Sequence, residues 1–174
     1  EGPVIQEADD RALSAGVTTD KIFDMVDDIA DKIHVPIVFM TYINPIYVYG
    51  VEKFAKRAKA CGAAGVIVPD VPFEEKEEIR GSFEAEGLVV ISMVAPTSAD
   101  RVRMIAKEAK GFLYCVSSLG VTGVRTEIGT AIGDLIQTVK EECSIPCAIG
   151  FGISTPEQAE AMAKISDGAI VGSA

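Results

Sequence analysis

Short apolar runs alternate with segments of helical periodicity along most of the chain. Six runs carry almost no charge, as expected for strands of a parallel sheet that is covered on both faces, and they occupy residues 37–42, 65–68, 88–94, 111–116, 146–149 and 168–171. Amphipathic helical segments separate most of them, at residues 51–60, 73–86, 99–109 and 132–142. This alternation predicts a βα repeat, with a parallel sheet and crossover helices.

The first 33 residues differ, because they show helical spacing only. Apolar positions predict one helix over residues 3–15 and a second from about residue 19 to residue 33. A βα barrel begins with a strand, so we expect these 174 residues to be a piece of a larger protein.

Two consecutive strand ends deliver glycine to a loop, at Gly150-Phe151-Gly152 and at Gly172-Ser173. The first loop leads into a well-marked helix, with Thr155 as the cap, Pro156 at the first position and Gln158 as a capping-box partner. Phosphate sites in (β/α)₈ barrels are often built from the loops after strands 7 and 8. The sequence therefore predicts a partial TIM barrel with about six of the eight parallel strands, as a single domain spanning residues 1–174.

Composition narrows the classes of function. The net charge of −10, without a basic block, argues against nucleic-acid binding. No apolar run approaches the roughly 18 residues of a membrane span and no signal peptide is evident, so we expect a cytoplasmic protein. The four cysteines lack a C-x-x-C spacing, which favours reduced thiols over a disulfide framework and predicts no metal site.

Several polar residues follow the predicted strands. Asn44 is expected in a loop. Asp70 could cap the helix that follows it, contact a partner or do acid–base work, and capping is the default expectation. Tyr114 is either core filler or a hydroxyl that lines a pocket. Residues 117–123 form either a lid over the site or an ordinary surface loop.

Five motifs, taken in order along the whole chain, resemble the alpha subunit of tryptophan synthase. They are Glu1-Gly2-Pro3-Val4-Ile5-Gln6, Asp70-Val71-Pro72, Gly120-Val121-Thr122-Gly123, Gly150-Phe151-Gly152-Ile153-Ser154 and Gly172-Ser173-Ala174. The resemblance implies a lyase of tryptophan biosynthesis, which cleaves indole-3-glycerol phosphate into indole and glyceraldehyde 3-phosphate by a retro-aldol reaction. It further implies a heterotetramer in which the alpha subunit has no cofactor and passes indole to a pyridoxal-phosphate beta subunit.

The resemblance also assigns roles to individual residues. Glu1 would be the second catalytic acid, Tyr114 would contact the substrate, and Thr122 would belong to the lid. The phosphate would be bound by Gly123, Gly152, Gly172 and Ser173; the indole pocket would be walled by Ile5, Phe39, Met40 and Phe151; Asn44 and Pro72 would face the beta subunit.

The principal Glu of the family, at the end of strand 2, is not among these residues. We therefore expect the isolated chain to be nearly inactive, and we expect it to self-associate through exposed strand edges. Two other classes remain open at this point. One is another phosphate-binding TIM-barrel enzyme, such as a phosphosugar epimerase or isomerase, and the other is a non-catalytic phosphate-binding α/β module.

Overall fold

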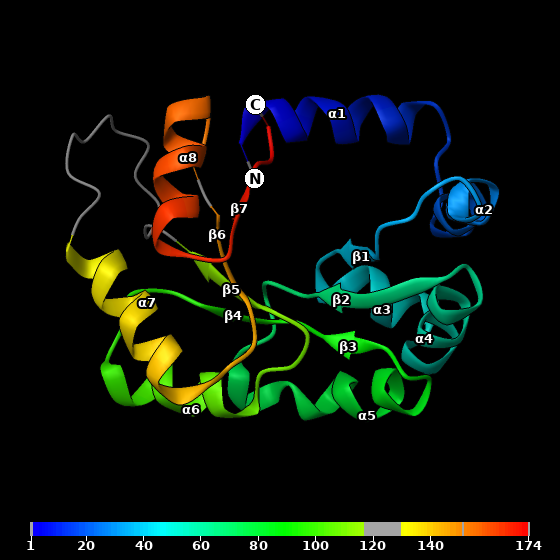
Figure 1. Ribbon diagram of the computed structural model, residues 1–174. Helices are drawn as coiled ribbons and strands as arrows, with labels where there is room; N and C mark the ends of the chain where they lie inside the picture. Colours follow the sequence, from blue (N-terminus) through cyan, green and yellow to red (C-terminus); the bar gives the residue numbers. More distant parts are fainter. Residues whose placement is uncertain (1, 117–129, 151, 174) are drawn as a thin grey trace. The chain divides into compact units, whose positions relative to one another are not determined.

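A computed structural model describes residues 2–116, 130–150 and 152–173, and the chain divides into two compact units, Glu1–Val90 and Ile91–Ala174. Figure 1 labels the helices and strands. Every strand pair in both units is parallel, which confirms the predicted α/β class. The prediction that residues 1–174 form one domain stays a prediction.

The first unit contains a sheet of order β1-β2-β3. Its elements are α1 (Pro3–Ser14), α2 (Thr19–Ala30), β1 (Ile37–Met40), α3 (Ile43–Tyr49), α4 (Val51–Ala60), β2 (Ala63–Ile67), the 3₁₀ turn η1 (Phe73–Glu75), α5 (Glu77–Ala85) and β3 (Val89–Val90). The register places Phe39 opposite Val66, and Gly65 opposite Val89.

An aromatic cluster forms the core of the first unit. The ring of Phe23, on α2, meets Phe39 at 5.3 Å, Phe54 at 5.0 Å and Tyr49 at 5.6 Å, all edge to face. Salt bridges also join the two helices, because the Arg57 guanidinium on α4 contacts the carboxylates of Asp24 and Asp27 on α2 at 2.7 and 2.6 Å. These contacts fix α2 and α4 against the same side of the sheet that Phe39 faces.

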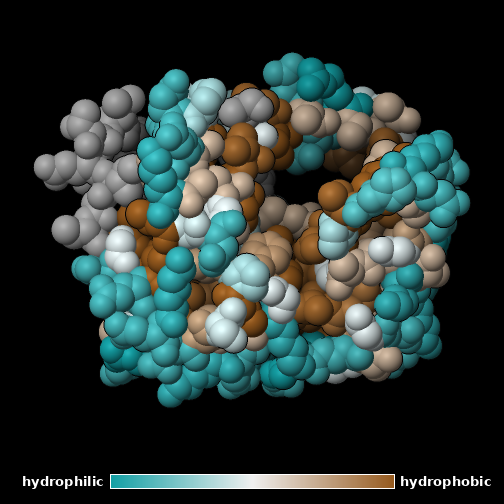
Figure 2. Space-filling model, in the orientation of Figure 1, coloured by the Kyte–Doolittle hydropathy of each residue, from teal (hydrophilic) through white to brown (hydrophobic). Residues whose placement is uncertain are grey.

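The second unit contains a sheet of order β4-β5-β6-β7. Its elements are β4 (Ser92–Val94), α6 (Ala99–Glu108), β5 (Leu113–Val116), α7 (Thr130–Glu142), β6 (Cys147–Gly150), α8 (Pro156–Ile165) and β7 (Gly168–Ile170). Leu113, Cys115, Val139 and Ile149 are completely buried in its core. Over α5 in one unit and α6 in the other, the surface is mostly hydrophilic, as Figure 2 shows.

The capping signals at the start of α8 were read correctly from the sequence. The Thr155 hydroxyl accepts from the Gln158 amide at 3.3 Å, and the Gln158 side chain accepts from the Thr155 amide at 3.2 Å, which is the predicted capping box. Ser98 caps α6 in the same way, by accepting from Arg101.

Three predicted elements were wrong in extent. The strand expected at 88–94 is divided at the buried Ile91, because its first half pairs with β2 and its second half with β5. The helix expected at 73–86 begins as the 3₁₀ turn η1 and becomes α5 only after Lys76. Helix α2 ends at Ala30, three residues before the predicted end.

Helix α3 was missed altogether, and Asn44 therefore lies in its first turn rather than in a loop. The segment holds Pro45 and several β-branched or aromatic residues, which have low helix propensity. Tertiary contacts override this tendency, since Ile46 is completely buried. Gly50 then ends α3 and begins α4. Its φ of +95° is a backbone conformation that residues with a side chain rarely adopt.

Candidate active site

The carboxyl ends of β5, β6 and β7 carry most of the predicted site residues that the structure describes. Tyr114 pairs with Ala148, Val116 pairs with Gly150, and Gly150 in turn pairs with Ile170. Because the strands are parallel, their carboxyl ends meet at one edge of the sheet, where barrel enzymes build their sites.

Tyr114 is buried and leans along the sheet over Gly150. A Cβ atom built on Gly150 would lie only 2.4 Å from the Tyr114 hydroxyl oxygen and 2.7 Å from Cζ. The absence of a side chain at position 150 therefore makes room for the phenol and sets where the hydroxyl lies at the end of β6. The sequence reading treated Gly150 as part of a glycine loop and missed this role, although a glycine at a strand position is a signal of close approach.

Gly152 follows β6 and turns the chain toward α8. Its φ of +72° lies in the left-handed region, and no heavy atom comes within 4 Å of a Cβ built there. The backbone is thus turned and open at this point, as a loop that approaches a ligand requires. Gly172, after β7, is similarly open, and Ser173 is exposed.

The start of α8 itself is occupied by the protein's own groups. The Gln158 side chain accepts from the amides of Ser154 and Thr155, at 2.8 and 3.2 Å. A hydrogen bond from the backbone N–H of Glu157 itself holds the pKa of its carboxyl below the usual range, and the Thr155 side chain adds to this effect. A carboxylate at this helix start competes with any second anion, so a phosphate cup depends on Gly152 and the loop after β7.

The predicted pocket residues of the first unit face different ways. The Phe39 ring packs into the aromatic cluster with Phe23 and Phe54. Successive strand residues face opposite sides, so Met40 at the end of β1 faces away from that cluster, and it is 53% exposed. Ile5 is half-buried on α1. The indole-wall role stays a prediction for all three, and Met40 fits it better than Phe39.

Four further site residues lie outside the described residues: Glu1, Thr122, Gly123 and Phe151. Their predicted roles as second acid, lid, phosphate ligand and indole wall stay predictions.

Asp70 does cap a helix, but the predicted helix was wrong. Its carboxylate accepts from the Ile43 amide at 3.0 and 3.2 Å, at the start of α3, 27 residues earlier in the chain. The segments that follow Asp70 begin without a side-chain cap. Asp70 therefore holds the first turn of α3, including Asn44, in place.

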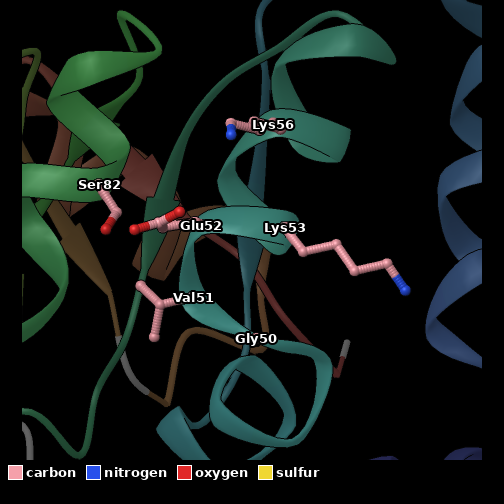
Figure 3. Close-up of a pocket in the computed structure, with 6 residues that line it drawn as sticks. All are labelled: Gly50, Val51, Glu52, Lys53, Lys56 and Ser82. Carbon is pink, nitrogen blue, oxygen red and sulfur yellow. The ribbon is translucent and has the colours of Figure 1, made fainter.

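A shallow groove of about 640 Å³ lies where α4 begins and α5 passes beside it. Figure 3 shows the Glu52 carboxylate and the Ser82 hydroxyl on facing sides of it, while Lys53 points away. None of the predicted site residues lines this groove, so it adds nothing to the candidate site.

The cysteines of the structure are free and three of them are buried. Burial raises the pKa of the Cys115 thiol to about 12, with smaller contributions from Cys147 and Cys143, so this thiol stays protonated. Within residues 2–116, 130–150 and 152–173, no three His, Cys, Asp or Glu side chains gather as metal ligands. In the same ranges, no helix is long and apolar enough to cross a membrane.

Comparisons with known proteins match the chain throughout. The sequence profile of the family described as "Tryptophan synthase alpha chain" matches residues 1–174. The chain is 47% identical over 174 residues to the tryptophan synthase alpha chain of Lacticaseibacillus casei, and 47% identical over 175 residues to that of Geobacillus kaustophilus. All of this chain is covered in both cases, but it spans only 65% of the length of each relative.

The solved structures that resemble this chain come from the same family. Tryptophan synthase subunit alpha from Campylobacter jejuni superposes with a TM-score of 0.91 at 34% identity, covering 99% of this chain and 69% of the other. The tryptophan synthase a2b2 complex of Pyrococcus furiosus gives a TM-score of 0.86 at 36% identity, covering 99% and 71%. These relatives are TIM barrels, and the parallel strands found here fit part of such a barrel, as predicted. The chain belongs to the tryptophan synthase alpha chain family.

Proposed function

We propose that this chain provides the phosphate cup and much of the substrate pocket of a lyase that cleaves indole-3-glycerol phosphate into indole and glyceraldehyde 3-phosphate. The observation that carries the proposal is the family match over residues 1–174, with the five landmark motifs in order. The two alternative classes, another phosphate-binding barrel enzyme and a non-catalytic module, gain no support from the comparisons.

The roles of the residues follow from the chemistry of the bond that breaks. Expelling the glycerol side chain from indole needs a proton at C3 and stabilisation of the ring N–H, which two carboxylates supply. Glu1 is proposed for the N–H, and the Tyr114 hydroxyl is proposed to line the pocket. The carboxylate that serves C3 is not among these 174 residues, so the chain by itself is expected to turn over very little substrate.

The phosphate is proposed to be held by backbone amides and one hydroxyl, without a lysine. The open backbone at Gly152 and Gly172 supports this, because both follow neighbouring parallel strands of one sheet. Gly123 and the Ser173 hydroxyl complete the proposed cup, and Thr122 belongs to the proposed lid. Met40, Ile5 and Phe151 are proposed to wall the indole.

The proposed partner is a beta subunit that carries pyridoxal phosphate, while this chain needs no cofactor of its own. The solved a2b2 complex of a relative supports such a partner. Asn44 and Pro72 are proposed to face it. The capping bond from Ile43 to Asp70 supports this face, because it fixes the turn of α3 that carries Asn44.

An NMR titration with glycerol 3-phosphate tests the phosphate cup directly. We expect saturable shifts of the Gly152, Gly172 and Ser173 amides, with no shift at Gly133, an exposed glycine of α7. Glycerol alone serves as the ligand control, and Ser173→Ala should weaken binding severalfold. Shifts that are absent in a well-folded sample would contradict the cup.

An indole-release assay tests the expected low activity. The isolated chain should release indole far more slowly than a full-length relative under the same conditions. A rate near that of the full-length protein would show that the proposed division of the two carboxylates is incorrect.

A further inference from the structure

The partner face proposed above consists of Asn44 and Pro72, and Asn44 lies on helix α3, which little burial holds in place. The helix has seven residues, and Ile46 is the one that is completely buried. Tyr47 and Val48, in its last turn, are 46% and 82% exposed. A helix this short is not stable by itself in water, so its position depends on bonds from other parts of the chain.

Two carboxylates from one segment bind α3 at two different turns. Asp70, in the loop after β2, accepts from the Ile43 amide at the start of the helix. Glu78, in the first turn of α5, accepts a hydrogen bond from the Tyr47 hydroxyl. The pKa of Tyr47 is raised above its usual value, first by this hydrogen bond and then by desolvation and by the charges of Glu78 and Glu75.

The two bonds restrain α3 in different ways. A single bond at Ile43 leaves the helix able to turn about that point, whereas a second bond one turn later also fixes its rotation. Tyr47 lies three residues after Asn44 and four after Ile43, so the three residues share one side of α3. The bond to Glu78 therefore acts on the side of the helix that carries Asn44.

The segment between the two carboxylates carries Pro72, the other residue of the partner face. Local contacts order this segment, because the Glu75 amide donates to the Pro72 carbonyl at 3.0 Å and the Lys76 ammonium lies 3.6 Å from the centroid of the Phe73 ring. An ordered segment that is bound to α3 at both of its ends holds Asn44 and Pro72 in a fixed relation to each other.

We propose that Glu78 is a positioning residue for the partner face. By accepting from Tyr47 it fixes α3 against α5, so that Asn44 and Pro72 are both in place before the partner arrives. A preformed surface loses less conformational entropy on binding, and the partner therefore binds more tightly. The inference rests on the beta partner proposed above, and it gives Tyr47 and Glu78 a role that lies outside the five landmark motifs.

Amide hydrogen exchange in the full chain tests the positioning itself. Tyr47→Phe and Glu78→Ala each remove the bond, and we expect the Gly50 amide, which donates to Ile46 at the end of α3, to exchange roughly fivefold faster. Glu78→Gln keeps an acceptor oxygen for the Tyr47 hydroxyl and should exchange nearly as slowly as the wild type. The Cys61 amide at the end of α4 is the internal reference. Unchanged exchange at Gly50 in both variants would overturn the proposal.

Binding of the partner tests the consequence, with the beta subunit of the Pyrococcus furiosus a2b2 complex as the probe. We expect Kd to rise by about two- to fivefold in Tyr47→Phe and in Glu78→Ala, and to stay near the wild-type value in Glu78→Gln. The double variant should bind like either single variant, because the two residues act through one bond. Side chains that each contacted the partner directly would give losses that multiply, and that result would overturn the positioning role.

Tyr49→Phe is the matched control, because the Tyr49 hydroxyl donates to Asp20 of α2 at 2.5 Å. This variant removes a tyrosine–carboxylate bond of the same kind from the same helix and leaves the bond to Glu78 intact. Its Kd should match that of the wild type, and an equal loss would show that general loosening of α3 weakens binding. A wild type that does not bind would overturn the proposed partner, whereas a wild type that binds no better than Tyr47→Phe and Glu78→Ala would overturn the positioning role alone.

Discussion

Gly150 is the position where a single methyl group should disturb both the packing and the candidate site. Gly150→Ala places a Cβ 2.4 Å from the Tyr114 hydroxyl oxygen, 2.7 Å from Cζ and 2.9 Å from Cε1. The shortest of these falls about 1 Å short of the 3.4 Å at which ordinary contact begins. Tyr114 is only 6% exposed, so relieving the contact requires its ring or the backbone of β6 to shift within a buried site.

The cost follows from the overpacking of a buried site. Inserting a methyl group into a packed core costs about 1–3 kcal/mol. For a chain of this length each kcal/mol lowers Tm by about 2–4 °C, so the middle of the range gives a fall of roughly 6 °C. If the Tyr114 hydroxyl moves by about 1 Å to relieve the clash, any activity of the complete enzyme should also fall, by up to about a hundredfold.

Thermal denaturation followed by circular dichroism measures the effect, with Gly133→Ala as the matched control. Gly133 lies in the exposed part of α7, and a Cβ built there has no heavy atom within 4 Å. Alanine favours the helix, so the control should gain about 0.5–1 kcal/mol. Gly150→Ala with Tyr114→Phe should recover only part of the loss, because the 2.7 Å contact with Cζ remains. A Gly150→Ala protein that melts at or above the wild-type temperature would refute the reasoning.

Three further predictions concern groups that hold element ends in place. Asp70→Ala should lower the free energy of unfolding by about 1 kcal/mol and speed amide hydrogen exchange in α3. Asp70→Asn keeps an acceptor for the Ile43 amide and should largely preserve the protection of α3 from exchange. Unchanged exchange in Asp70→Ala would contradict the capping role. Thr155→Ala should lower the free energy of unfolding, measured by urea denaturation, by about 1 kcal/mol, and Thr155→Ser should lower it much less. Equal losses for the two variants would contradict the role of the capping box. The Cys147 amide and then its thiol hold the pKa of Asp167 below its usual range, so Asp167 stabilises the fold above its unfolded pKa of about 3.9 and loses this effect as pH falls through its lower folded pKa. In thermal melts, the wild type should therefore have a higher Tm than Asp167→Ala at pH 7, and the difference in Tm should be smaller at pH 3. A difference in Tm that is equal at the two pH values would contradict this prediction.

Local signals account for what the sequence predicted well. The cap Thr155 lies beside the helix it begins, and it was identified from residues within three positions. The apolar runs were found because parallel strands covered on both faces need few polar residues. Such signals do not depend on where distant parts of the chain lie.

The elements that the sequence analysis missed or misplaced depend instead on distant parts of the chain. Helix α3 has a poor helical sequence and is held by the burial of Ile46 and by the distant Asp70. The division of the strand at Ile91 is decided by which neighbours, β2 or β5, the two halves find. No pattern within a window of ten residues contains either kind of information.

The candidate site shows the same limit at the level of single side chains. The family resemblance is enough to mark Phe39, Met40 and Tyr114 as residues of interest, but not to say which way each faces. The aromatic contacts of Phe39 assign its ring to the helix side of β1, and the close approach of Tyr114 assigns Gly150 a steric role beyond that of a turn. In a strand, adjacent residues face opposite sides, so Phe39 and Met40 do not present their side chains to the same face of β1. For this reason Met40, rather than Phe39, is the residue of β1 at which substitution should change indole recognition without disturbing the core.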